Sequence, residues 1–404
     1  MKVAVVNCGS SSIKYEVFDA RDCAMVATGL IEKIGGEDGR LRQRRLMADG
    51  TFDEQIHTKP LANHREAFDL LVSVNQRNQI IKDDAELLGI GHRVVHGGET
   101  FREPALIDSE VIAAIRDLIP LAPLHNPSNL LGIEAAQGQF PRVPQVAVFD
   151  TAFHQTLPAP AFHYALPYEF YEKHHIRKYG FHGSSHAYVT KEAAKHLGKP
   201  LAEVNLIVLH LGNGASAAAV QGGRSIDTTM GMTPLEGLIM GTRCGDIDPS
   251  IPFYLMHQTG MKSEEVESLL NRESGLKGIC GFSDMREIQD RAAKGNERAQ
   301  LAIEMFCYRI KEYIGAYYAV LGRLDAVVFT GGIGENACTI RERVCEGLEH
   351  LGISVDPGKN DAATGSAAEI QQNGFPVKVL VVRTNEEREI ALQTISTIEK
   401  AKVR

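Results

Sequence analysis

One local pattern occurs twice in this chain, and it restricts the possible folds more than any other feature. Residues 3–6 form a short apolar run typical of a β-strand, a turn rich in Asn, Gly and Ser follows, and apolar alternation resumes over 13–18. About half the chain later, the apolar run 206–211, the Gly-rich turn 212–216 and the apolar run 217–220 repeat this order. We therefore expect two related domains, each built on a β-hairpin.

The turns of both hairpins are suited to an anion. The first carries Asn7, three serines and, just after them, Lys14, so that backbone N–H groups, hydroxyl groups and a cation lie close together. An ordinary Gly-Ser turn has a similar composition, and for an isolated hairpin that interpretation is preferred. The repetition favours phosphate binding, with one nucleotide held between the two domains.

Composition limits the class of protein. A chain of 404 residues, 44% of them apolar and 23% charged, is expected to form two globular domains. A net charge of −8 argues against a nucleic-acid-binding surface. Seven cysteines without a Cys-x-x-Cys spacing indicate reduced thiols, and no signal peptide or membrane-spanning apolar run is expected. We expect a cytoplasmic protein that binds neither nucleic acid nor membranes.

Two charged residues stand within or directly after strand-like segments. Arg93 lies in the segment 88–98, and an unpaired arginine is costly to bury, so it should face a cleft or an anion. The alternative is an arginine in solvent on an edge strand. Asp150 follows the apolar run 145–149, which is where open α/β sheets place their chemistry, although a turn or helix cap uses Asp equally well.

Two segments in the second half concentrate polar residues among glycines. His182 and His186 have a spacing that zinc could use, but Gly183 and the serines after it are poor helix-interior residues, so we expect the helix over 187–197 and no zinc site. The long loop-like run 231–249 includes Arg243 and two aspartates. A loop of this length without regular structure is usually functional.

The last part of the chain carries weaker signals. Residues 332–337 fit the G-x-G-x-x-(G/A) pattern of dinucleotide-binding proteins, with Asp356 at a suitable distance. Thr384 and Glu387 have the spacing of a capping box for a terminal helix, and Ser283 is a candidate cap for another helix. Glu386 is not explained by the capping box.

Taken together, eight motifs resemble those of the acetate kinase family, in the same order and across essentially the whole chain. They lie at 7–14, 92–98, 149–154, 179–186, 210–214, 241–249, 332–336 and 384–387. The resemblance implies an α/β fold of two duplicated actin-like ATPase (ribonuclease H-like) domains with an interdomain cleft. Residues 1–150 plus 385–404 would form the N-terminal domain, and 151–384 the C-terminal domain for nucleotide binding and dimerisation.

The resemblance also implies roles for individual residues. The catalytic residues would be Asp150, His182 and Arg243, and the substrate-binding residues would be Arg93 and His125. The residues that contact ATP or ADP would be Lys14, His210, Leu211, Gly212, Asn213, Gly214, Asp284, Met285, Arg286, Gly332, Ile333, Gly334, Glu335 and Asn336.

A metal ion is part of the same expectation. Asn7 would lie near Mg²⁺, or Mn²⁺ in its place, and Glu386 would bind the ion through water. The implied reaction is reversible, direct in-line transfer of the γ-phosphoryl group of ATP to acetate, giving acetyl phosphate and ADP. Acetate is already ionised at pH 7, so we expect Asp150 to orient Arg93 or metal-bound water rather than to accept a proton. Members of the family are usually homodimers.

Three alternatives remain open at this point. A propionate kinase of the same family differs by one methylene in its substrate, which changes affinity by only about 1–3 kcal/mol. A dinucleotide-dependent oxidoreductase could be built on residues 332–337, but it leaves Arg93, His182 and Arg243 without a role. A non-catalytic ATP-binding protein similar to actin or the Hsp70 chaperones would not need those arginines.

Overall fold

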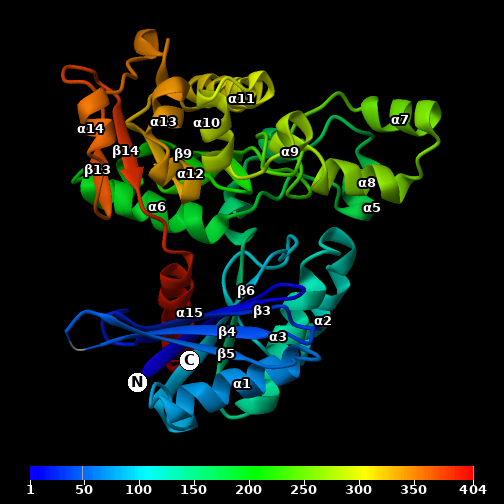
Figure 1. Cartoon of the computed structure of the whole chain (residues 1–404), viewed down its shortest axis with the longest axis vertical. Coiled ribbons are helices and arrows are strands. Elements are labelled where there is room, and N and C mark those ends of the chain that lie inside the picture. Colours follow the sequence, from blue (N-terminus) through cyan, green and yellow to red (C-terminus); the bar gives the residue numbers. More distant parts are fainter. Residues whose placement is uncertain (48, 404) are drawn as a thin grey trace. The chain divides into compact units, whose positions relative to one another are not determined.

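The computed structural model describes residues 1–47 and 49–403 (Figure 1). The chain separates into two compact units, which we call unit 1 (Met1–Ala152 with Asn385–Arg404) and unit 2 (Phe153–Thr384). None of the helices in the described ranges is long and apolar enough to cross a membrane.

Unit 1 is built on an eight-stranded sheet with the order β5-β4-β3-β2-β1-β6-β8-β7. Its strands are β1 (Lys2–Cys8), β2 (Ile13–Asp19), β3 (Met25–Glu32), β4 (Arg40–Leu46), β5 (Phe52–Thr58), β6 (Leu87–Val94), β7 (Ala105–Leu106) and β8 (Gln145–Phe149). The predicted hairpin is confirmed as β1 and β2, paired with Asn7 opposite Lys14. The strands β6 and β8 extend the sheet in parallel from β1, so Arg93 lies on an interior strand and the edge-strand alternative is wrong.

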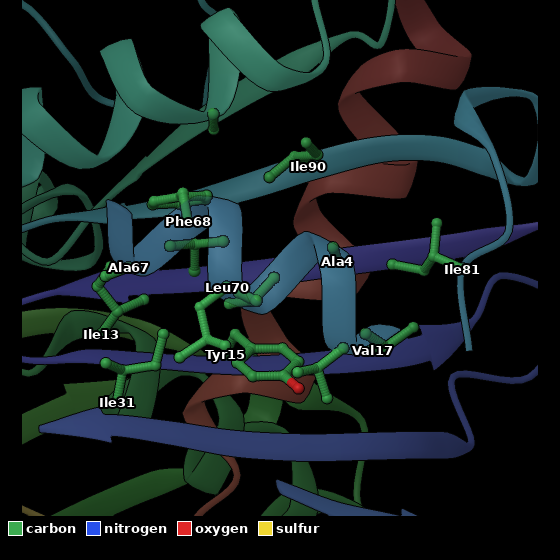
Figure 2. Packing of buried hydrophobic residues seen from close by; sticks show 14 of the residues in the cluster. Ala4, Ile13, Tyr15, Val17, Ile31, Ala67, Phe68, Leu70, Ile81 and Ile90 are labelled. Carbon is green, nitrogen blue, oxygen red and sulfur yellow. The ribbon is translucent and has the colours of Figure 1, made fainter. Parts of the chain in front are cut away.

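Helices cover both faces of this sheet. They are α1 (His64–Arg77), α2 (Ser109–Asp117), α3 (Asn126–Gln139) and α15 (Glu386–Val403). Because successive strand residues point to opposite faces, Ala4 of β1 joins a cluster with Phe68 of α1, whereas Val3 packs with Ile390 of α15. Figure 2 shows the first cluster, with Phe68 and Tyr15 between the helix and the sheet.

The terminal helix α15 belongs to the core of unit 1, although it is the last element of the chain. It contacts β1, β6 and β8, and in Figure 1 the red helix lies beside the blue strands. The approach is close because β6 carries glycine at the contact: a side chain at Gly91 would collide with Thr394 and Ile390. The apolar run of β1 is therefore buried on both faces, as a nearly continuous apolar strand requires.

Unit 2 contains a six-stranded sheet with the order β11-β10-β9-β12-β14-β13. Its strands are β9 (Asn205–Leu211), β10 (Ala215–Gln221), β11 (Arg224–Thr228), β12 (Ala326–Thr330), β13 (Ala367–Glu369) and β14 (Lys378–Val382). The sequence β11-β10-β9-β12-β14 repeats β3-β2-β1-β6-β8 of unit 1, with three antiparallel strands followed by two parallel ones. The prediction of a duplicated α/β architecture is confirmed.

The helices of unit 2 are mostly short, with one long exception. They are α4 (Ala159–Phe162), α5 (Glu169–His174), α6 (Gly183–His196), α7 (Ile251–Thr259), α8 (Ser263–Arg272), α9 (Gly275–Cys280), α10 (Met285–Ala293), α11 (Glu297–Leu321), α12 (Gly331–Asn336), α13 (Cys338–Cys345) and α14 (Pro357–Asp361). The long helix α11 begins after Asn296, whose side chain caps it, and ends at Gly322 in the left-handed conformation. Residues 231–249 contain no helix or strand, as predicted.

The predictions about the starts of α6 and α10 are wrong. The helix α6 begins at Gly183 rather than at Ala187, because His182 before it adopts the left-handed conformation and turns the chain into the helix. The helix α10 is capped by Asp284, which accepts the backbone N–H of Arg286, and not by Ser283. The argument that Gly183 is unsuited to a helix therefore no longer speaks against zinc.

The start of α15 also differs from the prediction. The side chain of Asn385 accepts the backbone N–H of Arg388 at 2.9 Å, so Asn385 is the cap and the Thr384–Glu387 capping box is not formed. The dinucleotide pattern lacks its second strand as well, since Val355 makes only an isolated bridge and Asp356 caps α14.

Candidate active site

The predicted site residues of unit 1 gather at the ends of parallel strands. Arg93 is near the end of β6 and Asp150 follows β8, and the backbone N–H of Asp150 donates to Val94 at 2.9 Å. Nε of Arg93 lies 3.1 Å from both carboxylate oxygens of Asp150, and Nη2 lies 2.7 Å from Oδ2. Asp150 is only 1% exposed. The arginine is therefore held by a buried carboxylate that accepts with both oxygens.

The first turn of α15 adds two carboxylates to this group. Glu386 lies 3.9 Å from Nη2 of Arg93, and Glu387 forms an ion pair with Lys14 of β2. Burial raises the pKa of Glu386 to about 7, with Arg93 acting to lower it and Asp150 and Glu387 to raise it. Burial opposes the charge of Arg93, but the neighbouring Asp150 and Glu386 outweigh it and raise the pKa of the guanidinium.

The turn after β6 is fixed by asparagines that the sequence did not single out. Asn129 accepts the N–H of Val95 at 3.0 Å and donates to the carbonyl of Cys8, which links this turn to the end of β1. Asn126 accepts the N–H of His96 at 3.1 Å. His125 stands at the start of α3, directly before Asn126, with its side chain exposed. The buried amides brace the strand end that carries Arg93.

In unit 2, the carboxyl ends of three parallel strands bring the nucleotide motifs together. His210 on β9 is opposite Thr330 on β12, and Thr384 follows β14. Glu335 of α12 accepts the N–H of Gly331 and the N–H of Thr384, both at 3.0 Å. Gly331 has φ 77° and lies against the backbone of β9, where a side chain would not fit. This edge is where open α/β sheets place their ligands.

His182 and Arg243 converge near Gly214 in the turn between β9 and β10. A Cβ built on Gly214 would lie 3.2 Å from Nη2 of Arg243 and 3.4 Å from Nε2 of His182. Arg243 also donates to the carbonyl of Pro234 at 2.7 Å, and burial lowers its pKa. In the part of the chain that the structure describes, no carboxylate forms an ion pair with Arg243. This guanidinium can therefore bind an external anion.

Hydroxyl groups that sequence reasoning missed hold the histidines of this edge. Ser185 lies 2.7 Å from Nδ1 of His210 and 2.7 Å from the hydroxyl of Thr384. Ser216 contacts Nδ1 of His182 at 2.9 Å, and the rings of His182 and His210 stack at 4.4 Å. A signal for Ser216 was present, since it is the one hydroxyl among the apolar residues 215–220, although the predicted Gly-rich turn 212–216 included it.

The remaining predicted nucleotide residues are less closely gathered. Asp284 and Arg286 are paired with each other at the start of α10, while the side chain of Met285 is buried in the core. Asn336 donates to the carbonyl of Gly332 at 2.8 Å and also lines a groove of about 720 Å³ between α10, α11 and α13. Leu211 is fully buried, so only its backbone is available to a ligand.

The donor set of unit 1 fits a hard divalent cation. Glu16, Asp150, Glu386 and Glu387 place four carboxylates around the two cations Lys14 and Arg93. Burial raises the pKa of Glu16 to about 7, and the negative charge of Glu387 adds to the rise. Residues 1–47 and 49–403 contain no group of three or more His, Cys, Asp or Glu placed to hold a metal. Mg²⁺ usually needs only one or two carboxylates besides phosphate and water.

Comparison with known proteins identifies the family of this chain. Residues 2–392 match the model of the Acetokinase family. An acetate kinase of Syntrophobacter fumaroxidans is 58% identical over 404 residues, which is 100% of this chain and 98% of the relative. The crystal structure of Porphyromonas gingivalis acetate kinase has a TM-score of 0.92 and 44% identity, covering 98% of this chain and 99% of that one.

A second solved structure has the same architecture and a different name. The propionate kinase from Francisella tularensis has a TM-score of 0.91 and 43% identity, covering 97% of this chain and 98% of that one. The family match spans nearly the whole chain, and the duplicated sheets agree with it. This chain belongs to the Acetokinase family and is a phosphotransferase that uses ATP.

Proposed function

We propose that this chain transfers the γ-phosphoryl group of ATP to acetate, reversibly and directly in line, giving ADP and acetyl phosphate. The convergence of His182 and Arg243 near Gly214 carries the proposal. Phosphoryl transfer needs little covalent chemistry from a protein, and is accelerated mainly by positioning and by neutralising charge on the transferred group. An arginine without a carboxylate partner beside a histidine meets that need.

The proposed roles follow the contacts within each unit. Residues 385–404 with 1–150 supply Arg93 for the carboxylate of acetate, with His125 supporting the phosphoryl group. Residues 151–384 supply the nucleotide contacts of the β9, β12 and β14 strand ends. Asp150 orients Arg93 and moves no proton, because both of its oxygens already accept from that guanidinium and acetate needs no base.

Mg²⁺ is proposed as the cofactor, with Mn²⁺ as a substitute. Glu386 would hold it through water, and Asn7 at the end of β1 would lie close to it. When bound, the ion supplies positive charge to the phosphate oxygens of ATP. The excess of carboxylates around Lys14 and Arg93 supports this assignment.

Two further proposals concern the whole protein. A homodimer through unit 2 is supported by α7, on which Phe253 and Tyr254 are each 64% exposed. Sedimentation of the wild type and of Phe253→Glu tests this, and a wild-type monomer would contradict it. A cytoplasmic location stays a prediction from the sequence.

The activity is tested by trapping acyl phosphate as hydroxamate with formate, acetate, propionate and butyrate in the presence of ATP and Mg²⁺. We expect the highest kcat/KM with acetate. A higher value with propionate would favour the second candidate, which the similarity to the Francisella tularensis propionate kinase keeps open. Absence of acyl phosphate with all four acids would refute the proposed function.

A further inference from the structure

A single serine hydroxyl in unit 2 joins two histidines. Ser216 is fully buried on β10, and its Oγ lies 2.9 Å from Nδ1 of His182 and 2.8 Å from Nε2 of His186. His186 is also fully buried, and its Nδ1 has no hydrogen-bond partner in the described part of the chain. The serine has one proton to donate, so it can donate to only one of the two histidines. The position of the proton on one ring therefore restricts its position on the other.

Two of the possible proton arrangements leave a buried donor without an acceptor. If both histidines donated to Ser216, its buried hydroxyl proton would have no acceptor within the described residues. If Ser216 donated to His186, the proton of a neutral His186 would be on Nδ1, which has no partner. Burial, with His154 and His210 adding to it, lowers the pKa of His186 well below its usual value, so this ring is neutral. Buried N–H groups without acceptors are rare in folded proteins.

The remaining arrangement gives an acceptor to the hydroxyl proton of Ser216 and to the ring proton of His186. Nε2–H of His186 donates to Ser216, and the hydroxyl of Ser216 donates to Nδ1 of His182. Only one unprotonated ring nitrogen, Nδ1 of His186, is then without a partner, and a buried acceptor is tolerated better than a buried donor. The ring proton of a neutral His182 is consequently on Nε2, the nitrogen that lies on the side of Gly214 and Arg243.

We propose that Ser216 and His186 are positioning residues that hold the ring proton of His182 on Nε2, so that His182 donates an N–H to the phosphoryl group. The nature of the group that His182 faces rests on the proposed function, but the placement of the proton does not. With the proton on Nδ1, the ring would direct a lone pair at an anion, and its attraction to the phosphoryl oxygens would be lost. The contact with Ser216 and the stacking of the ring on His210 hold His182 in one orientation.

The proton placement is measured directly by ¹⁵N NMR of histidine-labelled, full-length protein. The His182 signals are assigned by their absence in His182→Gln. In the wild type we expect Nε2 to be protonated and Nδ1 to show the shift of an unprotonated nitrogen that accepts a hydrogen bond. In Ser216→Ala that Nδ1 signal should move. A wild-type His182 protonated on Nδ1, or a signal that does not change in Ser216→Ala, overturns the proposal.

Kinetics of the same variants test the consequence. Ser216→Ala should lower kcat roughly 10- to 100-fold, while KM for ATP changes less than about threefold, since the donor acts on the transition state. His186→Gln retains an N–H that can reach Ser216 and should keep most of the activity, whereas His186→Leu should not. If Ser216→Ala does not fold, the comparison of His186→Gln with His186→Leu tests the proposal in its place. Equal activity of the Gln and Leu variants would contradict the proposed hydrogen-bond relay from His186 through Ser216 to His182.

The chain offers a matched control. Ser225 is another fully buried serine, and its hydroxyl lies 2.8 Å from Nδ1 of His154, whose Nε2 donates to the carbonyl of Phe181. Ser225→Ala should leave the His182 signals unchanged and kcat within about twofold of the wild type. An equal shift in both serine variants would show a general packing effect and would refute the relay. A wild type without acyl phosphate activity refutes only the proposed function, because the NMR result stands by itself.

Discussion

The guanidinium of Arg93 binds the carboxylate of Asp150 through Nε and Nη2, and the carboxylate is 1% exposed. Replacing the arginine therefore leaves a buried charge without its partner. Arg93→Ala should lower kcat/KM by the equivalent of about 3–4 kcal/mol and also lower stability by roughly 3 kcal/mol. Urea unfolding and acetate kinetics measure the two effects. Unchanged stability would show that the buried charge of Asp150 is not stabilised by the ion pair with Arg93.

Arg243 should behave differently, since no carboxylate in the described ranges forms an ion pair with it. Arg243→Ala should lose about 3–4 kcal/mol of transition-state stabilisation with stability nearly unchanged. Lysine should restore little, because a point charge does not replace the planar fork of a guanidinium. Near-normal turnover in a folded Arg243→Ala variant would contradict its assignment to the phosphoryl group.

The two neighbouring glutamates of α15 should separate in their response to magnesium. Glu386→Gln should lower turnover strongly and raise the Mg²⁺ concentration needed for half-maximal rate, since this carboxylate is proposed to hold the ion. Glu387→Gln breaks the ion pair with Lys14, which is partly exposed, and should cost only about 0.5–1 kcal/mol of stability. Magnesium titrations of both variants test the contrast. Identical titrations would show that Glu386 has no special role.

The cap of α15 gives a prediction about stability alone. Asn385→Ala removes the acceptor for the N–H of Arg388 and should cost about 1 kcal/mol. Thr384→Val removes the hydroxyl contact with Ser185 but no cap, so it serves as the matched control for stability. Thermal melts of both variants compare them. A larger loss in Thr384→Val would return the capping role to the threonine.

Buried histidines should make the protein sensitive to acid. Burial lowers the pKa of His92 and of His154 to about 4, although Gln145 beside the first and the Phe181 carbonyl beside the second act to raise it. Between about pH 6.5 and 4 the unfolded chain binds more protons than the folded one, so stability falls as the pH falls through this window. Each histidine accounts for a loss of up to roughly 3 kcal/mol in the free energy of unfolding across this window.

The acid effect is checked by urea unfolding at pH 7 and pH 5. His92→Gln and His154→Gln remove the titrating group and should flatten the pH dependence, whatever they do to stability at pH 7. A wild-type protein that is equally stable at both pH values would rule out the two histidines as the cause.

The sequence predicted elements whose pattern is local. The apolar runs of β1 and β9 and the charged residues after the strands are visible without tertiary structure, so Arg93 and Asp150 were found. The hydroxyl partners of the histidines were not predicted, because Ser185 and Ser216 reach the histidines only when α6 and β10 pack together in the fold. Local spacing predicted the Thr384–Glu387 capping box for α15, whereas Asn385, directly before the helix, accepts the N–H of Arg388.

The position of α15 has a consequence for the order in which the protein can be completed during synthesis. Val3 and Val5 on one face of β1 pack against Ile390 and Ile398, which leave the ribosome only after the whole of unit 2. All of unit 2 is therefore synthesised before unit 1 can close its core. A transcript or protease that ends the chain before Ile390 would leave that apolar sheet face uncovered, and the truncated product would aggregate or be degraded even though every residue of unit 2 is present.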